Sequence, residues 1–204
     1  MVQPLDYLKE TPSQTAGPYV HIGLVPNKLG NTGIYPVDLG DSPVRDGAKG
    51  EPVTITGRVV DGAGMILRDA LMESWQADAA GIHPGGDPRG AADPAVTGWA
   101  RIVADFDSGE WVLKTIKPGR VPAPDGRLMA PHISLWVVAR GINLGLQTRI
   151  YFEDEAEANA ECPVLARIEH RARVDTLIAK RTGPGAYRFD VILQGQNETV
   201  FFDI

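Results

Sequence analysis

The chain has 204 residues, long enough for one sizeable hydrophobic core, and we predict one globular domain rather than two. Its 26 acidic residues outnumber its 20 basic ones, and no long basic run appears, which disfavours nucleic acid as a partner. The first residues lack an apolar signal core, and no apolar run is long enough to cross a membrane. We therefore expect a soluble, cytoplasmic protein with no membrane partner.

Residues 1–50 differ in composition from the rest of the chain. They are rich in Pro, Gly, Asn and Asp and show little periodicity. Such a segment is typical of an extended arm that docks on a partner surface rather than of a core element. We therefore predict an N-terminal arm and interface segment over 1–50 and a domain over 51–204.

From residue 52 onward, apolar and polar side chains alternate with the period of half-buried strands. Strands are predicted over 52–59, 71–75, 100–106, 110–116, 132–139, 148–152, 187–193 and 199–202. Asp107, Ser108 and Gly109 separate the third and fourth of these, which predicts a hairpin.

Two segments are short helices at best. Residues 154–160 are acidic and alanine-rich, and residues 173–180 place Val174, Leu177 and Ile178 on one helical face. Seven or eight short strands with regularly spaced turns favour an all-β fold. The predicted architecture is an antiparallel β-sandwich with an extended N-terminal arm and one or two short helices.

Three isolated residues have simple interpretations. Cys162 is the single cysteine, and its neighbours are apolar, so we predict a buried and inert thiol. His21 and His170 stand alone in polar contexts, and we predict that both lie on the surface.

Several short motifs together resemble a known family. They are TPSQTAGPY at 11–19, WQAD at 75–78, TIKPG at 115–119, APHIS at 130–134 and IYFE at 150–153. With these motifs the chain resembles the intradiol ring-cleaving dioxygenases over nearly its whole length, most weakly at 26–50 and 83–97. The first motif is similar to that of the alpha subunits of protocatechuate 3,4-dioxygenases in this family. The resemblance implies an intradiol dioxygenase-like β-sandwich.

The same resemblance implies a ferric site made of two tyrosines and two histidines, of which this chain keeps one ligand. The corresponding positions hold His83, Val121, His132 and Ser134. Valine has no donor atom, and a neutral serine is a poor substitute for imidazole. Relatives also carry arginine and glutamine where this chain has Met129 and Arg149. We name His83, Val121, His132, Ser134 and Arg149 the vestigial metal pocket.

Alternatives remain open for three of these residues. His132 is either a hydrogen-bonded structural histidine or, with His83, part of a weak two-histidine site, although no carboxylate with facial-triad spacing accompanies them. Arg149 either points into the pocket and replaces the iron structurally, or it faces solvent from its strand.

The resemblance further implies that the arm and one loop line a substrate cavity in a partner subunit. The matching residues are Thr15, Gly17, Pro18, Tyr19 and Arg140. Protocatechuate carries a ring carboxylate, for which a guanidinium is a natural partner. Without the motif match, Arg140 would be read as capping a strand end and Tyr19 as packing at an interface.

We therefore expect a non-catalytic alpha subunit of a hetero-oligomeric dioxygenase. The resemblance implies that Fe(3+) lies in the partner beta subunit, that this chain binds no metal, and that the beta subunit cleaves protocatechuate with O2 to 3-carboxy-cis,cis-muconate. One alternative is a self-sufficient homo-oligomeric intradiol enzyme with an altered metal site. Another is a metal-free β-sandwich that only binds a ligand or a protein.

Overall fold

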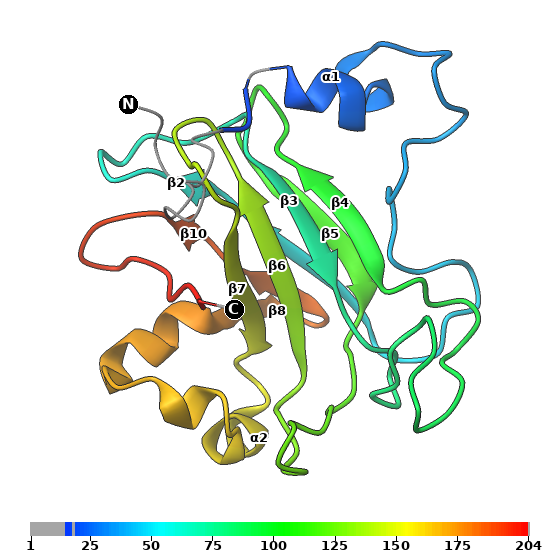
Figure 1. Cartoon of the computed structure of the whole chain (residues 1–204), viewed down its shortest axis with the longest axis vertical. Coiled ribbons are helices and arrows are strands. Elements are labelled where there is room, and N and C mark those ends of the chain that lie inside the picture. Colours follow the sequence, from blue (N-terminus) through cyan, green and yellow to red (C-terminus); the bar gives the residue numbers. More distant parts are fainter. Residues whose placement is uncertain (1–14, 18, 204) are drawn as a thin grey trace, which may run out of the picture.

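The computed structural model describes residues 15–17 and 19–203, and one large sheet dominates it (Figure 1). Eight strands follow the order β4-β3-β6-β7-β8-β9-β1-β5. Their bounds are β1 Pro52–Gly57, β3 Leu71–Trp75, β4 Trp99–Val103, β5 Trp111–Ile116, β6 His132–Val138, β7 Leu146–Phe152, β8 Ile178–Gly183 and β9 Ala186–Arg188. A second pair joins β2, Val59–Val60, to β10, Val191–Ile192. The predicted β-rich sandwich is therefore confirmed in outline, as a nearly closed sheet.

The predicted hairpin at residues 100–116 forms only its turn. The Asp105 N–H donates to the Glu110 carbonyl at 2.8 Å, and one bridge joins Ala104 to Trp111. Beyond this bridge the strands separate, because β4 pairs with β3 and β5 pairs with β1. Both strands bury their inward side chains in the same core, and diverging from the turn lets them enclose it from the two edges of the sheet.

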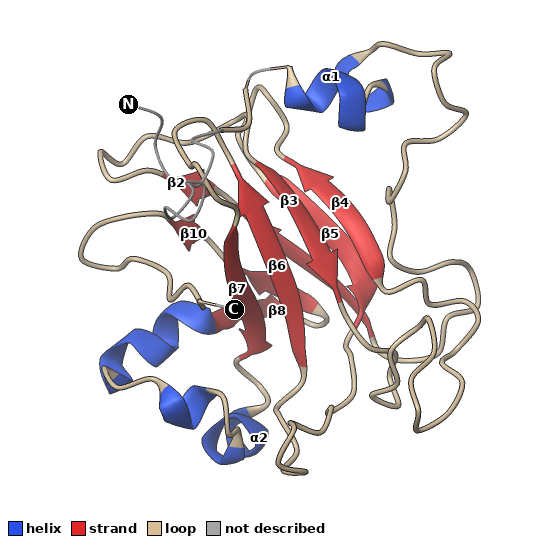
Figure 2. Ribbon diagram, viewed as in Figure 1, coloured by secondary structure: helices blue, strands red, loops and turns tan. Residues whose placement is uncertain are grey.

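The sheet is mixed rather than purely antiparallel, which corrects the prediction on this point. The pairs β7–β8, β1–β9 and β2–β10 are parallel. A parallel pair needs a long crossover, and residues 153–177 provide the one between β7 and β8. This crossover contains α2, Ala156–Glu161, and the 3-10 helices η2, Leu165–Arg167, and η3, Arg171–Leu177, which lie beside the sheet in Figure 2.

The helix predicted over 154–160 is confirmed by α2, whereas the second prediction is only partly right. Residues 171–177 form 3-10 helix, but strand β8 begins at Ile178, where pairing with Tyr151 takes over. The strand predicted over 187–193 is split into β9 and β10, and residues 199–202 contribute only a bridge from Phe202 to Gln147. The alternation of apolar and polar residues within one segment does not show which other strand that segment pairs with.

Two hydrophobic clusters lie on opposite faces of β6 and β7. The main core contains Ile133 and Leu135 from β6 and Ile150 from β7, together with Trp111. The second cluster lies toward the crossover helices and contains Val121, Met129, Ala130, Tyr151, Cys162, Leu165 and Leu177. Since successive side chains of a strand alternate between faces, the vestigial metal pocket belongs to the side of the second cluster.

The described part of the N-terminal segment carries α1, Val20–Leu24, and the short helix η1, Asn27–Leu29. His21 of α1 is fully buried with its ring edge against Phe106, so its predicted surface position was wrong. His170 is exposed and Cys162 is buried, as predicted.

The domain boundary at residue 50 stays a prediction. Across residues 15–17 and 19–203, no helix has the length and apolar character needed to cross a membrane.

Candidate functional site

Strands β6 and β7 carry the centre of the vestigial metal pocket. His132 is paired with Tyr151 and Ser134 with Arg149 in the antiparallel register. Directly paired residues point to the same face of a sheet, so these four side chains share the face opposite the main core. The short motifs at 130–134 and 150–153 are thus brought together by pairing.

His132 is a buried, hydrogen-bonded imidazole. Its Nδ1 lies 2.8 Å from the Ala130 carbonyl oxygen, and because a carbonyl only accepts, Nδ1 carries the proton. Its ring is tilted against that of Tyr151, with centroids 5.6 Å apart. Burial, followed by the positive charge of Arg149, lowers the pKa of His132 to about 4. His132 is therefore neutral at pH 7.

His83 is oriented by an aromatic contact. Its ring stacks on Trp75 at a centroid distance of 5.6 Å and an interplanar angle of 5°. Its backbone N–H donates to the Asp87 carboxylate at 3.1 Å. Burial is the largest cause that lowers the pKa of His83, and His83 in turn contributes slightly to the lowered pKa of His132.

The other side chains around this site, at the ligand position Val121 and at the neighbouring Tyr151, are also unsuited to a ferric ion. Val121 is buried, and its carbonyl accepts a hydrogen bond from the Met129 N–H at 2.8 Å. Tyr151 is buried beside Cys162, and burial raises the pKa of its hydroxyl. Among the described residues, no three His, Cys, Asp or Glu side chains are placed to hold a metal ion together. A hard trivalent cation needs anionic oxygen donors, so this donor set does not fit it.

Arg149 is a half-buried member of the vestigial metal pocket, on the strand face that it shares with His132 and Ser134. Its Nη1 is 3.3 Å from the Met129 sulfur, and its Cζ is 5.8 Å from the Phe202 ring centroid. It also lines, with Ser134, a hollow of about 530 Å³. The hollow is completed by Ala123, Pro124, Met129, Gln147, Thr148, Pro163, Val164, Arg167, Ile168, Val200, Phe202 and Asp203. We name this hollow the outer-face hollow.

Two of the predicted substrate-binding residues, Thr15 and Arg140, lie close together just beyond the other end of β6. The Thr15 hydroxyl donates to the Ala139 carbonyl at 3.1 Å and accepts from the Gly141 N–H at 2.9 Å. Arg140, which lies between these two residues, forms an ion pair with Asp69 while its side chain stays 61% exposed. The structure thus places Thr15 and Arg140 together just beyond β6, whose residues from His132 to Val138 span about 20 Å at the usual rise of a strand.

The other arm residues are less constrained within this chain. Tyr19 is 77% exposed and begins α1 as its N-cap residue. No atom of the described residues lies within 4 Å of the place where a Cβ of Gly17 would stand, so no contact among them requires a glycine there. Pro18, like residues 11–14 of the first motif, lies outside the described residues.

Several contacts in and around these sites were not predicted. Asp69 precedes β3 and lies 71 positions before Arg140, and no local sequence pattern joins them. Arg167 and Phe202 reach the outer-face hollow from the crossover and from the C-terminal tail. In the sequence, only the charge of Asp69 could have suggested an ion pair, and only the apolar and aromatic residues of the tail could have suggested that it packs against a pocket.

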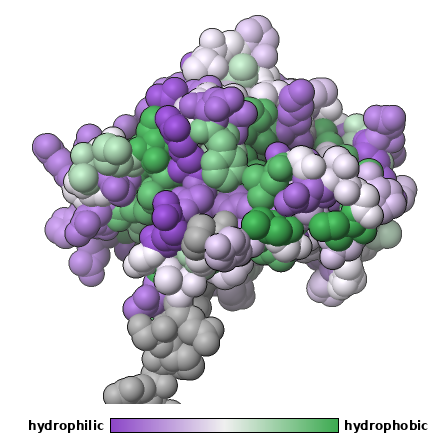
Figure 3. All heavy atoms as spheres, turned by 90° about the horizontal axis from the view of Figure 1, so that it is seen from above, coloured by the Kyte–Doolittle hydropathy of each residue, from purple (hydrophilic) through white to green (hydrophobic). Residues whose placement is uncertain are grey.

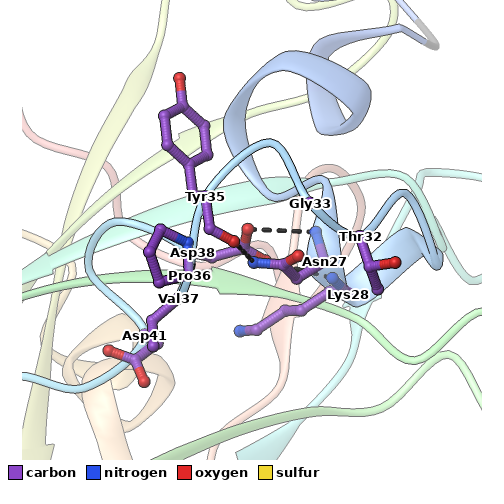
Figure 4. A pocket seen from close by; sticks show the side chains of 9 residues that line it. All are labelled: Asn27, Lys28, Thr32, Gly33, Tyr35, Pro36, Val37, Asp38 and Asp41. Atoms are coloured by element: carbon purple, nitrogen blue, oxygen red, sulfur yellow. Dashed lines mark hydrogen bonds between the residues drawn. The ribbon is translucent and has the colours of Figure 1, made fainter.

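A second hollow lies within the N-terminal segment and is structural. It measures about 750 Å³, and Figure 4 shows its lining, which contains none of the predicted site residues. The Asp38 carboxylate accepts hydrogen bonds from the backbone N–H groups of Asn27 and Lys28, each at 3.1 Å. These bonds close the loop onto η1. Burial is the main cause that lowers the pKa of Lys28.

The same segment exposes many large apolar side chains. They are Tyr19, Ile22, Ile34, Tyr35, Val37 and Leu39. Seen from above, the end of the molecule that carries α1 shows green, hydrophobic groups among purple, hydrophilic ones (Figure 3). Large apolar side chains that gather on an exposed segment commonly mark a protein interface.

Comparisons with known proteins give the family. A family model described as a dioxygenase matches residues 37–195. The alpha chain of protocatechuate 3,4-dioxygenase from Pseudomonas putida is 48% identical over 203 residues, covering 98% of this chain and 99% of that relative. The beta chain of protocatechuate 3,4-dioxygenase from Burkholderia cepacia is 32% identical over 174 residues, covering 79% of this chain and 73% of that relative.

A solved structure of similar fold is catechol 1,2-dioxygenase from Acinetobacter sp. ADP1. It has a TM-score of 0.54 and 21% sequence identity, and the match covers 75% of this chain and 56% of that chain. The fold and the sequence relatives indicate the same family. The chain belongs to the intradiol dioxygenase family.

Proposed function

We propose that this chain is the alpha subunit of a protocatechuate 3,4-dioxygenase, without a metal centre of its own, and that it works in a cytoplasmic hetero-oligomer. The observation that carries the proposal is the donor set of its vestigial metal pocket. Val121 and Ser134 replace two ligands, and the positive charge of Arg149 acts on His132. The iron and the ring cleavage therefore belong to the beta subunit, which converts protocatechuate and O2 to 3-carboxy-cis,cis-muconate.

This chain contributes one wall of the beta subunit's substrate cavity. Thr15, Gly17, Pro18, Tyr19 and Arg140 form that wall in the proposal. Support comes from the two hydrogen bonds of Thr15, which fix the backbone on both sides of Arg140, and from the high exposure of Arg140 and Tyr19. An exposed guanidinium on a fixed loop is suited to bind the carboxylate of protocatechuate.

The arm and the apolar side chains around α1 form the contact with the beta subunit in this proposal. Apolar residues at positions 19–39 are exposed in the isolated chain, and burying them against a partner is favourable. We propose accordingly that residues 1–50 act as the interface segment and residues 51–204 as the dioxygenase-like domain.

Co-purification tests the proposal. This chain is expressed alone and together with the beta chain, and iron content and protocatechuate-dependent O2 uptake are measured for both preparations. We expect iron and activity only in the co-expressed complex, and the iron content of the complex should be unchanged by His132→Ala. Stoichiometric iron and ring cleavage in the chain alone would instead support a self-sufficient enzyme.

A further inference from the structure

The adjacent ends of strands β3 and β6 place Asp69 across from Arg140. In the antiparallel register of these strands, Leu71 is paired with Val138. Continued past that pair, the same register sets Asp69 opposite Arg140, and directly opposite residues point to the same face of a sheet. The ion pair between them therefore follows from the course of two strands that are fixed in the sheet.

Arg140 is held at two points, its backbone and the inner part of its guanidinium. The Thr15 hydroxyl bonds the Ala139 carbonyl and the Gly141 N–H on either side of it. The Asp69 carboxylate pairs with Nε, the guanidinium nitrogen nearest the backbone. Within residues 15–17 and 19–203, no hydrogen bond occupies the terminal Nη groups, and the Arg140 side chain stays 61% exposed. Both Nη groups are thus available to an incoming carboxylate.

The Asp69 carboxylate is well placed to fix a more mobile partner. Its side chain is only 12% exposed, and the next residue, Ala70, is buried in the main core. Burial lowers the pKa of the nearby His21, and the Ala70 backbone and the Asp69 carboxylate only partly offset this effect. His21 is therefore neutral at pH 7 and does not compete with Arg140 for the carboxylate.

A contribution to stability does not by itself account for this ion pair. Water screens a pair whose guanidinium is largely exposed, so the pair adds little to the free energy of folding. A free arginine side chain, in contrast, loses much rotamer freedom when it binds a ligand, and a partner that already fixes the side chain reduces that loss. Because the guanidinium is planar, fixing its Nε also fixes the directions of its Nη groups.

We propose that Asp69 is a positioning residue that orients Arg140 for the carboxylate of the substrate. This inference rests on the proposed function, in which Arg140 lines the cavity of the beta subunit. Asp69 does not touch the substrate, but it holds the Nε edge of the guanidinium so that the Nη edge faces the cavity. Its removal should weaken the preference for protocatechuate over catechol, since only protocatechuate carries a carboxylate.

Steady-state kinetics of the assembled complex tests the proposal through one ratio, kcat/KM for protocatechuate divided by kcat/KM for catechol. We expect Asp69→Ala to lower this ratio by about twofold to tenfold, because a free side chain must then be immobilised on binding. Asp69→Asn should lower it less, because the amide oxygen can still accept from Nε. In the Arg140→Gln background, where no guanidinium is left to orient, Asp69→Ala should change the ratio no further. The matched control is Asp125→Ala, which removes the partner of the exposed Arg127 and should leave the ratio unchanged.

Arg140→Lys keeps the test decisive if Asp69→Ala impairs folding. Lysine retains the charge at this exposed position but has no Nε for Asp69 to hold, so the ratio should fall by about twofold or more. An Arg140→Lys variant that keeps the full ratio would overturn the proposal.

Three results with the Asp69 variants would also overturn it. The first is an Asp69→Ala ratio that is unchanged or raised, since a raised ratio means that Asp69 competes with the substrate for Arg140. The second is an effect of Asp69→Ala that persists in Arg140→Gln, and the third is an Asp69→Asn variant no better than Asp69→Ala. If Arg140→Gln lowers the ratio and Asp69→Ala does not, only the positioning role is lost. A ratio unchanged in Arg140→Gln itself would remove the proposed function of Arg140 as well.

Discussion

The two ends of strand β6 have opposite characters. At the His132 end, the positions that correspond to metal ligands hold a neutral imidazole, a valine and a serine beside an apolar cluster. At the Ala139 end, the Thr15 hydroxyl bonds the backbone of Ala139 and Gly141 on either side of the exposed Arg140, and Asp69 forms an ion pair with its guanidinium. One end is organised toward the interior of the chain, whereas the other presents a fixed charge to its surroundings.

The difference shows that the strand pair β6–β7 can keep its packing in the main core while the residues on its other face change. The β6–β7 register buries Leu135 and Ile150 on one face whatever stands on the other face, so the loss of metal donors does not disturb the main core. Substitutions at one end of β6 should therefore leave the behaviour of the other end unchanged.

His132→Gln should remove a pH dependence of stability. Folded His132 takes up its proton only near pH 4, while the unfolded chain does so near 6.5. Between these values the unfolded state holds more protons, so the free energy of unfolding falls as the pH falls, by up to about 3 kcal/mol. Urea denaturation at pH 4.5, 5.5 and 7 would measure this slope, and glutamine can still donate to the Ala130 carbonyl.

The matched control is His170→Gln, which changes an exposed histidine. His21 and His83 also have lowered pKa values and contribute with the same sign, so His132→Gln should reduce the slope rather than abolish it. A slope equal to that of the unmodified chain would contradict the buried, neutral assignment of His132.

Arg140→Gln tests the other end of β6. In the assembled enzyme we expect kcat/KM for protocatechuate to fall by about tenfold to a hundredfold, since a charged hydrogen bond contributes about 1.5 to 3 kcal/mol. Unsubstituted catechol, which lacks the carboxylate, should be affected much less. Steady-state kinetics with both substrates checks this.

Arg127→Gln is a suitable control, because Arg127 is as exposed as Arg140 and also pairs with an aspartate. It should leave the ratio of the two substrates unchanged. Equal losses for protocatechuate and catechol in Arg140→Gln would argue against carboxylate recognition and for a structural role of its ion pair with Asp69.

Much of this arrangement could be predicted from local patterns. Alternation located the strands that contain Ile55, Leu113 and Ile133, because each strand buries one face. The motif at 130–134 likewise located His132 and Ser134 on a single strand face. These features depend on spacing within one segment, which the sequence displays directly.

Contacts between segments that are distant in the sequence could not be predicted from such local patterns. The turn at 107–109 was recognised, but the pairing of β4 and β5 with different neighbours depends on how the whole sheet closes. His21 occurs in a polar context yet is buried, because its helix packs against Phe106. The ion pair of Asp69 with Arg140 and the tail around Phe202 arise in the same way from tertiary packing.

Arg149→Gln asks whether the guanidinium stabilises the vestigial pocket in place of a metal ion. We expect the free energy of unfolding to fall by about 1 to 3 kcal/mol, because partly buried polar groups near Arg149 lose a donor and the Phe202 ring loses its cation. The variant should still bind no iron. The unfolding midpoint and the iron content of this one variant test both statements.

Arg181→Gln provides the comparison, since it removes an exposed strand arginine from β8. An Arg149→Gln variant as stable as this control would show that Arg149 has no structural role in the pocket. Iron binding by Arg149→Gln would show that charge repulsion, rather than the missing donors, keeps the metal out.

Tyr19→Phe should have the smallest effect and defines how far the Arg140 end extends into the arm. The Tyr19 ring is largely exposed in this chain, so its hydroxyl is available to the partner's cavity. Loss of one neutral hydrogen bond, about 0.5 to 1.5 kcal/mol, lowers kcat/KM by about twofold to tenfold, equally for protocatechuate and catechol. Tyr35→Phe, in the same segment, should leave kcat/KM unchanged. If Tyr19→Phe is also without effect, the arm is a docking element only, and carboxylate recognition rests on Arg140 alone.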